Sequence, residues 1–75
     1  MVTMTVFTTP EATAGTRSAL LELAAVSPDQ LQIGKELGDR FVVYFSREGA
    51  GPDDLRALIV ERHPAVADGI RVVAD

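Results

Sequence analysis

The stretch LQIGKELGDRFVVYF, residues 31–45, decides how this chain folds, because it has the pattern of two short strands joined by a tight turn. Leu31, Ile33 and Leu37 share a face of the first arm, and Phe41, Val43 and Phe45 share a face of the second, as the period of two in a strand requires. Gly38 and Asp39 lie between the arms, and such a pair is common in hairpin turns. The sequence therefore predicts an antiparallel hairpin, and the length of its turn decides which side chains share a face.

The turn length matters because a shift of one residue moves every side chain of a strand to the other face. A two-residue turn at Gly38 and Asp39 would pair Glu36 with Phe41 and divide the apolar residues between the two faces. A three-residue turn over 36–38, with Gly38 in the left-handed region, keeps them together. We therefore predict a bulged three-residue turn that buries the odd-numbered residues of both arms. The pairs expected are Ile33 with Phe41, Leu31 with Val43 and Lys35 with Asp39.

Helices are predicted on both sides of this hairpin. Thr8 or Thr9 as a cap and Pro10 in the first turn favour a helix that ends near residues 27–29. Gly15 weakens this helix, which suggests a close contact at that position. A second helix is expected to begin at Gly51 and Pro52 and to end at Pro64. The residues expected on the buried stripes are Ala12, Thr16, Ala19, Leu20, Leu23 and Val26 in the first helix, and Leu55, Leu58, Ile59 and the stem of Arg62 in the second.

Two further strands are predicted at the ends of the chain, because residues 2–8 and 70–75 alternate with a period of two. The resulting order is strand, helix, strand, strand, helix, strand, which is that of the ferredoxin-like βαββαβ sandwich. We predict an α+β fold, a single domain over residues 1–75, with an antiparallel sheet in the order 4-1-3-2 and both helices on one face. The side chains expected to point inward from the end strands are Val2, Met4, Val6, Ile70, Val72 and Ala74.

Composition restricts the classes of function. The 75 residues include no cysteine, which excludes disulfides and thiolate metal sites. Lys and Arg number 7 against 11 Asp and Glu, and the basic residues are scattered along the sequence, which disfavours binding to nucleic acid phosphates. The chain shows no secretory signal and no apolar run long enough to span a membrane, so we expect a cytoplasmic protein.

Few residues are candidates for chemistry. His63 is the single histidine and is expected at the exposed end of the second helix. Asp53 and Asp54 follow a glycine-rich loop, but they stand where a bound phosphate would lie, and they are expected to complement the helix dipole instead. We therefore predict no enzymatic activity, no cofactor and no metal site.

The face of the predicted sheet that points away from the helices is the most informative feature. It is expected to carry an apolar centre ringed by polar side chains, and interfaces between proteins usually have this composition. We predict an acidic accessory domain that mediates a protein–protein interaction, as a homodimer or with a different protein. The residues expected to bind the partner are Phe7, Val42, Tyr44 and Val73 in the centre, with Thr5, Gln32 and Arg71 around them.

Two alternatives remain open. Aromatic side chains on the central strands of such a sheet are also used to bind single-stranded RNA, although a basic groove is not evident in the sequence. A regulatory domain that senses a small metabolite is the other alternative, with Gly15 and the loop at 46–51 expected to line a cleft.

Overall fold

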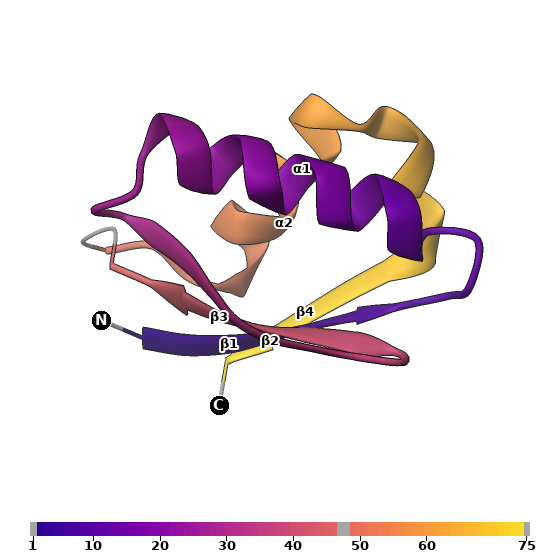
Figure 1. The fold of residues 1–75 in the computed structure, drawn as a ribbon, viewed down its shortest axis with the longest axis horizontal. Helices are drawn as coiled ribbons and strands as arrows, with labels where there is room; N and C mark the ends of the chain where they lie inside the picture. The colour runs from indigo at the N-terminus through magenta and orange to yellow at the C-terminus, as the bar shows by residue number, and fades with distance from the viewer. Residues whose placement is uncertain (1, 47–48, 75) are drawn as a thin grey trace.

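A computed structural model of the chain describes residues 2–46 and 49–74, which form two layers (Figure 1). The strands make one antiparallel sheet in the order β2-β3-β1-β4, and both helices lie on the same face of it. This arrangement confirms the predicted ferredoxin-like α+β fold and its strand order. The elements are β1 (Val2–Thr8), α1 (Thr13–Val26), β2 (Leu31–Leu37), β3 (Arg40–Phe45), α2 (Pro52–Arg62), the 3-10 helix η1 (Pro64–Gly69) and β4 (Ile70–Ala74).

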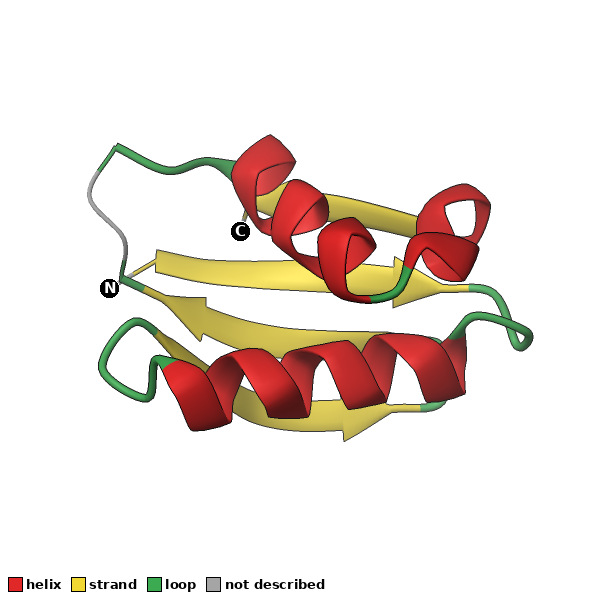
Figure 2. Cartoon of the chain, turned by 90° about the horizontal axis from the view of Figure 1, so that it is seen from above, coloured by secondary structure: helices red, strands yellow, loops and turns green. Residues whose placement is uncertain are grey.

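The helices divide the covered face of the sheet between them (Figure 2). Helix α1 contacts β2, whereas α2 contacts β4 and η1. The core lies between the helices and the sheet, because the apolar residues of the strands alternate and send one set of side chains toward the helices. None of the helices in the described part of the chain is long and apolar enough to cross a membrane. The core residues are Met4, Val6, Ala12, Ala19, Leu20, Leu23, Leu31, Phe41, Val43, Phe45, Leu55, Ile59 and Val66.

The predicted register of the β2–β3 hairpin is wrong. The turn has two residues, Gly38 and Asp39, and Leu37 pairs with Arg40. Nearer the open end of the hairpin, Ile33 pairs with Val43 instead of the predicted Phe41. Leu31 pairs with Phe45 instead of the predicted Val43. The predicted pair of Lys35 with Asp39 does not form, since Lys35 lies opposite Val42.

A bulge at Gly34 reconciles this short turn with a buried apolar face. The register shifts by one residue between Ile33 and Lys35. Residues of odd number face the helices in the first half of β2, and residues of even number, such as Glu36, face them in the second half. The prediction that both arms bury their odd-numbered residues is therefore confirmed for β3 and for the first half of β2 only. In the second half of β2 the odd-numbered Leu37 faces away from the helices and is 44% exposed.

Glu36 is held in its new orientation by helix α1. The Arg17 guanidinium donates two hydrogen bonds to the Glu36 carboxylate, from Nε to Oε1 at 2.7 Å and from Nη2 to Oε2 at 2.8 Å. This ion pair connects the middle of α1 to the edge strand of the sheet. The Arg17 hydrogen bonds hold the pKa of the Glu36 carboxyl below its ordinary value of 4.5.

Several boundaries and orientations also differ from the predictions. Helix α1 begins at Thr13 rather than at Pro10, and neither Thr8 nor Thr9 caps it, because residues 10–12 form a turn first. Val26, the last residue of α1, is 66% exposed. The remaining residues predicted to be buried but found exposed are Val2 and Ala74 at the ends of their strands, and Arg62 at the end of α2.

Other local predictions are confirmed. Gly51 precedes α2, Pro52 is its first residue, and the Gly51 N–H donates to the Asp54 carboxylate at 2.7 Å. The close contact expected at Gly15 exists as well, since a Cβ atom there would lie 2.7 Å from Cγ1 of Val66. Helix α1 can therefore approach η1 closely only because residue 15 has no side chain.

Candidate functional site on the open sheet face

The sheet has one face that no helix covers in the described residues, and we call it the open sheet face (Figure 1). Strand alternation and the observed registers place its side chains in three rows across the sheet, of which the first two run from β2 to β4 and the third from β2 to β1. The rows contain Leu37, Arg40, Phe7 and Arg71 in the first, Lys35, Val42, Thr5 and Val73 in the second, and Gln32, Tyr44 and Thr3 in the third.

These rows bring the predicted partner-binding residues together on one face, but they separate the two aromatic rings. Phe7 lies in the first row and Tyr44 in the third, with the pair of Thr5 and Val42 between them. Because a strand rises about 3.4 Å per residue, the two rings are attached roughly 13 Å apart along the sheet. The open sheet face is therefore a strip with an aromatic residue toward each end.

Phe7 lies between two arginines. It pairs with Arg40 on β3 and with Arg71 on β4, and the guanidinium carbons lie 4.8 and 4.9 Å from the centroid of its ring. Since β3 and β4 flank β1 on opposite sides, the two guanidiniums approach the ring from opposite sides. Cation–π attraction thus holds two positive charges within about 10 Å of each other on the open sheet face.

Arg40 is also bound to its neighbour in the turn. Its Nε donates to Oδ1 of Asp39 at 2.9 Å, and its Nη2 donates to Oδ2 at 3.2 Å. The hydrogen bond from Arg40 holds the pKa of the Asp39 carboxyl below its ordinary value of 3.8. Within the described residues, Arg71 forms no ion pair, and its guanidinium lies over the Phe7 ring.

Three of the basic residues that are scattered along the sequence come together in the fold. Lys35, Arg40 and Arg71 all belong to the open sheet face, and in the described part of the chain the acidic side chain beside them is Asp39. The other described acidic residues lie on the helices, in the connecting segments or on the helix-facing side of β2; they are Glu11, Glu22, Asp29, Glu36, Asp53, Asp54, Glu61 and Asp68. A chain of net charge −4 therefore presents a basic surface on one side.

The middle and third rows are less charged. Thr5 is only 8% exposed, while Val42 and Val73 on either side of it are half-buried. Tyr44 is 37% exposed, and its ring covers the bulge, since a Cβ atom on Gly34 would lie 2.5 Å from the Tyr44 Cε2 atom. Tyr44 is thus both part of the surface and a support for the irregular edge strand.

Sequence reasoning missed the contributions of Arg40 and Lys35. The signal for Arg40 was its position directly after the turn, but its place beside Phe7 depends on the pairing of β1 with β3. Lys35 reaches the open sheet face because the bulge reverses the orientation of the strand after Gly34. Gln32 and Arg71, which were predicted, are exposed on this face.

The residues considered for chemistry lie apart from the open sheet face. His63 ends α2 and is half-buried beside Gly15, with Nδ1 3.6 Å from the position of a Cβ there. Gly15, which was predicted to line a metabolite cleft, lies against the side chains of Val66 and His63. Residues 47 and 48 of the loop proposed for that cleft lie outside the described residues. Within the described chain, no group of three or more His, Cys, Asp or Glu side chains could hold a metal ion.

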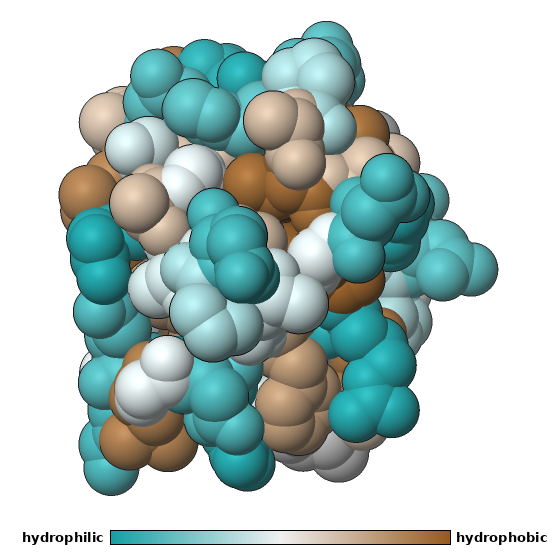
Figure 3. All heavy atoms as spheres, turned by 90° about the vertical axis from the view of Figure 1, so that its right-hand side faces the viewer, coloured by the Kyte–Doolittle hydropathy of each residue, from teal (hydrophilic) through white to brown (hydrophobic). Residues whose placement is uncertain are grey.

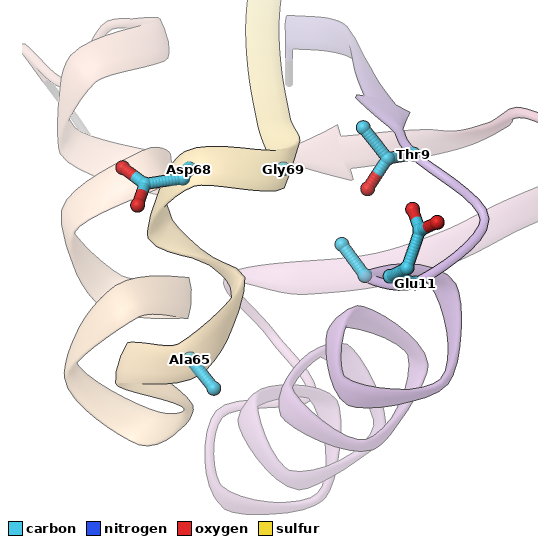
Figure 4. A pocket seen from close by; sticks show the side chains of 6 residues that line it. Thr9, Glu11, Ala65, Asp68 and Gly69 are labelled. Atoms are coloured by element: carbon cyan, nitrogen blue, oxygen red, sulfur yellow. The ribbon is translucent and has the colours of Figure 1, made fainter.

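A shallow groove of about 300 Å³ lies at the end of the molecule where β1 leads toward α1 and η1 leads into β4. Hydrophilic and hydrophobic atoms are mixed over this end (Figure 3). Figure 4 shows the Glu11 carboxylate pointing toward Thr9, whereas the Asp68 carboxylate points away from both. The two acids therefore do not converge on a common point, as a metal site or an acid–base pair would require. The groove is lined by Thr9, Glu11, Ala12, Ala65, Asp68 and Gly69.

Comparison with protein-family models, with curated proteins and with solved structures gave no match to this chain. The geometry and charge of the open sheet face are therefore the features from which we infer a function.

Proposed function

We propose that this domain is a non-catalytic interaction module that binds an acidic segment of a partner protein on its open sheet face. The observation that supports this most directly is Phe7 between the guanidiniums of Arg40 and Arg71, at 4.8 and 4.9 Å, on a surface without a helix above it. Stacking on the ring restricts the motion of both guanidiniums. They can therefore bind carboxylates with a smaller loss of side-chain entropy than free arginines would.

Charge is the reason for choosing an acidic partner. The open sheet face combines Lys35, Arg40 and Arg71 with half-buried apolar side chains, while the remainder of the described surface carries most of the acids. An acidic segment with apolar side chains matches both properties, because carboxylates can pair with the arginines while apolar groups cover Val42 and Val73. Tyr44 supplies the exposed aromatic anchor at the other end of the strip.

Single-stranded RNA fits this surface less well. Bases stack on the free face of an aromatic ring, but two guanidiniums already lie 4.8 and 4.9 Å from the centroid of the Phe7 ring and would compete with a base for it. A second copy bound face to face also fits less well, because it would place the basic residues of both copies in one interface without matching acids. RNA binding and face-to-face self-association would each give a distinct result in the binding experiment.

The test is binding of a fluorescein-labelled peptide of alternating glutamate and tyrosine, followed by fluorescence anisotropy at low and physiological salt. We expect wild-type protein to bind this probe and the Arg71→Gln variant to bind it roughly two- to fivefold more weakly, as for the loss of one exposed ion pair. Tyr44→Asp should abolish binding while the circular dichroism spectrum stays that of the wild type, because it removes the anchor and adds a repelling charge.

The matched control is Arg62→Gln, which removes the same charge from the exposed end of α2 on the helical side. If the Arg71→Gln and Arg62→Gln variants bind the peptide with equal affinity, then the net charge of the protein, and not the open sheet face, determines binding. A mixed-sequence single-stranded RNA that binds more tightly than the peptide, with a steep salt dependence, would replace the proposal by RNA binding. A doubled mass by light scattering that Tyr44→Asp abolishes would replace it by face-to-face self-association.

A further inference from the structure

The two edges of the sheet differ in how well they are protected against pairing with another strand (Figure 2). Edge strand β2 contains the bulge at Gly34, followed by Lys35, and is tied to α1 by the ion pair of Arg17 with Glu36. Bulges and lysines are the usual means by which edge strands avoid pairing. Strand β4 has neither, since its sequence is Ile-Arg-Val-Val-Ala and its register with β1 runs without a break from Thr8–Ile70 to Met4–Ala74.

The backbone of β4 offers free hydrogen-bonding groups at every second residue. The Thr9 N–H donates to the Gly69 carbonyl at 2.9 Å, in line with the register of β1 and β4. In an antiparallel pair, bonded and non-bonded positions alternate, so Arg71 and Val73 direct their backbone groups toward β1. Val72 and Ala74 therefore direct theirs outward, to the edge of the sheet.

This edge is complementary to itself. If two copies of β4 pair antiparallel about a two-fold axis at Val72, then Val72 lies opposite Val72 and Ala74 lies opposite Ile70. In the Val72–Val72 pair and in the Ala74–Ile70 pairs, the outward-directed N–H and C=O groups of one copy meet those of the other. On the open sheet face the same register places Arg71 opposite Val73 and not opposite the second Arg71, so like charges do not face each other directly.

We propose that β4 pairs with β4 of a second copy of this chain, which joins the two sheets into one sheet of eight strands. The pairing is isologous, because the same residues contribute from both copies. It also extends the open sheet face across both copies, with the Arg71 side chains of the two copies near the junction. A short edge of five residues makes a small interface, so the dimer is weak and depends on concentration.

The experiment is sedimentation equilibrium or light scattering of the 75-residue chain at increasing concentration, up to roughly 1 mM, where weak association is visible. We expect the mass of the wild type to rise from 8.0 kDa toward twice that value. Val72→Pro should keep the mass at 8.0 kDa, because proline removes the outward N–H while the bonds of β4 to β1 remain. Ala74→Lys should weaken the dimer as well, by placing a charge opposite Ile70.

The matched control is Val72→Thr, which keeps both the branched side chain and the N–H, and which should dimerise like the wild type. The proposal is overturned if the wild type stays monomeric over this range, or if Val72→Pro dimerises like the wild type with an unchanged circular dichroism spectrum. If Tyr44→Asp abolishes the dimer and Val72→Pro does not, the contact is on the open sheet face. Peptide binding by a monomeric Val72→Pro variant would show that the interaction proposed above is independent of the dimer.

Discussion

At the scale of single residues, Gly15 shows how a tertiary contact can reverse an intrinsic preference. Replacing a glycine inside a helix by alanine ordinarily stabilises a protein by about 1 kcal/mol. At this position the added Cβ would lie 2.7 Å from Cγ1 of Val66, which is 3% exposed. Overpacking of this kind costs roughly 1–3 kcal/mol. We therefore expect Gly15→Ala to lower the free energy of unfolding, as measured by urea denaturation.

The control for this prediction removes the obstructing methyl group. In a Val66→Ala background, Gly15→Ala should stabilise the protein, because the gain in helix propensity is no longer offset by the clash. A stabilised Gly15→Ala single variant would mean that α1 and η1 can separate at little cost. The sequence indicated a contact at Gly15, but it could not name Val66 as the partner because η1 was not predicted.

At the scale of elements, the ring of Tyr44 lies where a side chain at residue 34, in the bulge of β2, would have to be placed. A Cβ atom on Gly34 would lie 2.5 Å from Cε2 and 2.9 Å from Cζ of that ring. Gly34→Ala should therefore displace the ring and lower the free energy of unfolding by about 1 kcal/mol, near the lower end of the cost of overpacking, because the ring is partly exposed and can move. Urea denaturation of the single variant measures this loss.

A double-mutant cycle with Tyr44→Ala tests whether the ring is the cause. Without the ring, alanine at position 34 should be neutral or slightly stabilising, since glycine inside a strand costs about 0.5–1 kcal/mol relative to alanine. The same loss of stability in both backgrounds would place the origin of the glycine requirement in the backbone of the bulge instead. In that case the Tyr44 ring would not determine the stability of the hairpin, and its proposed role in binding a partner would be a separate matter.

The hairpin also shows which parts of the fold local sequence patterns can predict. Alternation and turn residues were sufficient for the existence of β2 and β3 and the burial of Phe41 and Val43, and the order of helices and strands along the chain was sufficient for the strand order. They were insufficient for the register, because two solutions keep the apolar residues together: a longer turn or a bulge within the strand. The contacts made at the bulge are tertiary, between Gly34 and Tyr44 and between Glu36 and Arg17.

At the scale of the whole molecule, the separation of charges could not be predicted from the linear sequence. Arg71 is distant along the chain from Lys35 and Arg40, which belong to one hairpin, and strand pairing together with the bulge at Gly34 brings the three to one face. The apolar and aromatic members of the candidate site were predictable, because alternation assigns them to the face opposite the core. The chemistry expected of the partner therefore changed when the registers became known, whereas the location of the candidate site did not.

The stability of the whole molecule should depend on pH through the two described ion pairs. Arg17 and Arg40 lower the pKa values of the Glu36 and Asp39 carboxyls below 4.5 and 3.8. At acidic pH the unfolded chain consequently binds more protons than the folded chain at these positions, so the free energy of unfolding falls as the pH decreases. The stabilisation is complete above the ordinary pKa values and is lost as the pH falls through the lowered ones.

Both pairs are exposed, so the effect of each is small and should weaken with salt. We expect Glu36→Gln to be less stable than the wild type at pH 7, and the difference should shrink as the pH is lowered through the carboxyl range. Chemical denaturation at a series of pH values, at low and high salt, measures this convergence. A difference that stays constant from pH 7 to pH 2 would show that Glu36 acts through packing of its side chain against α1 and not through its charge.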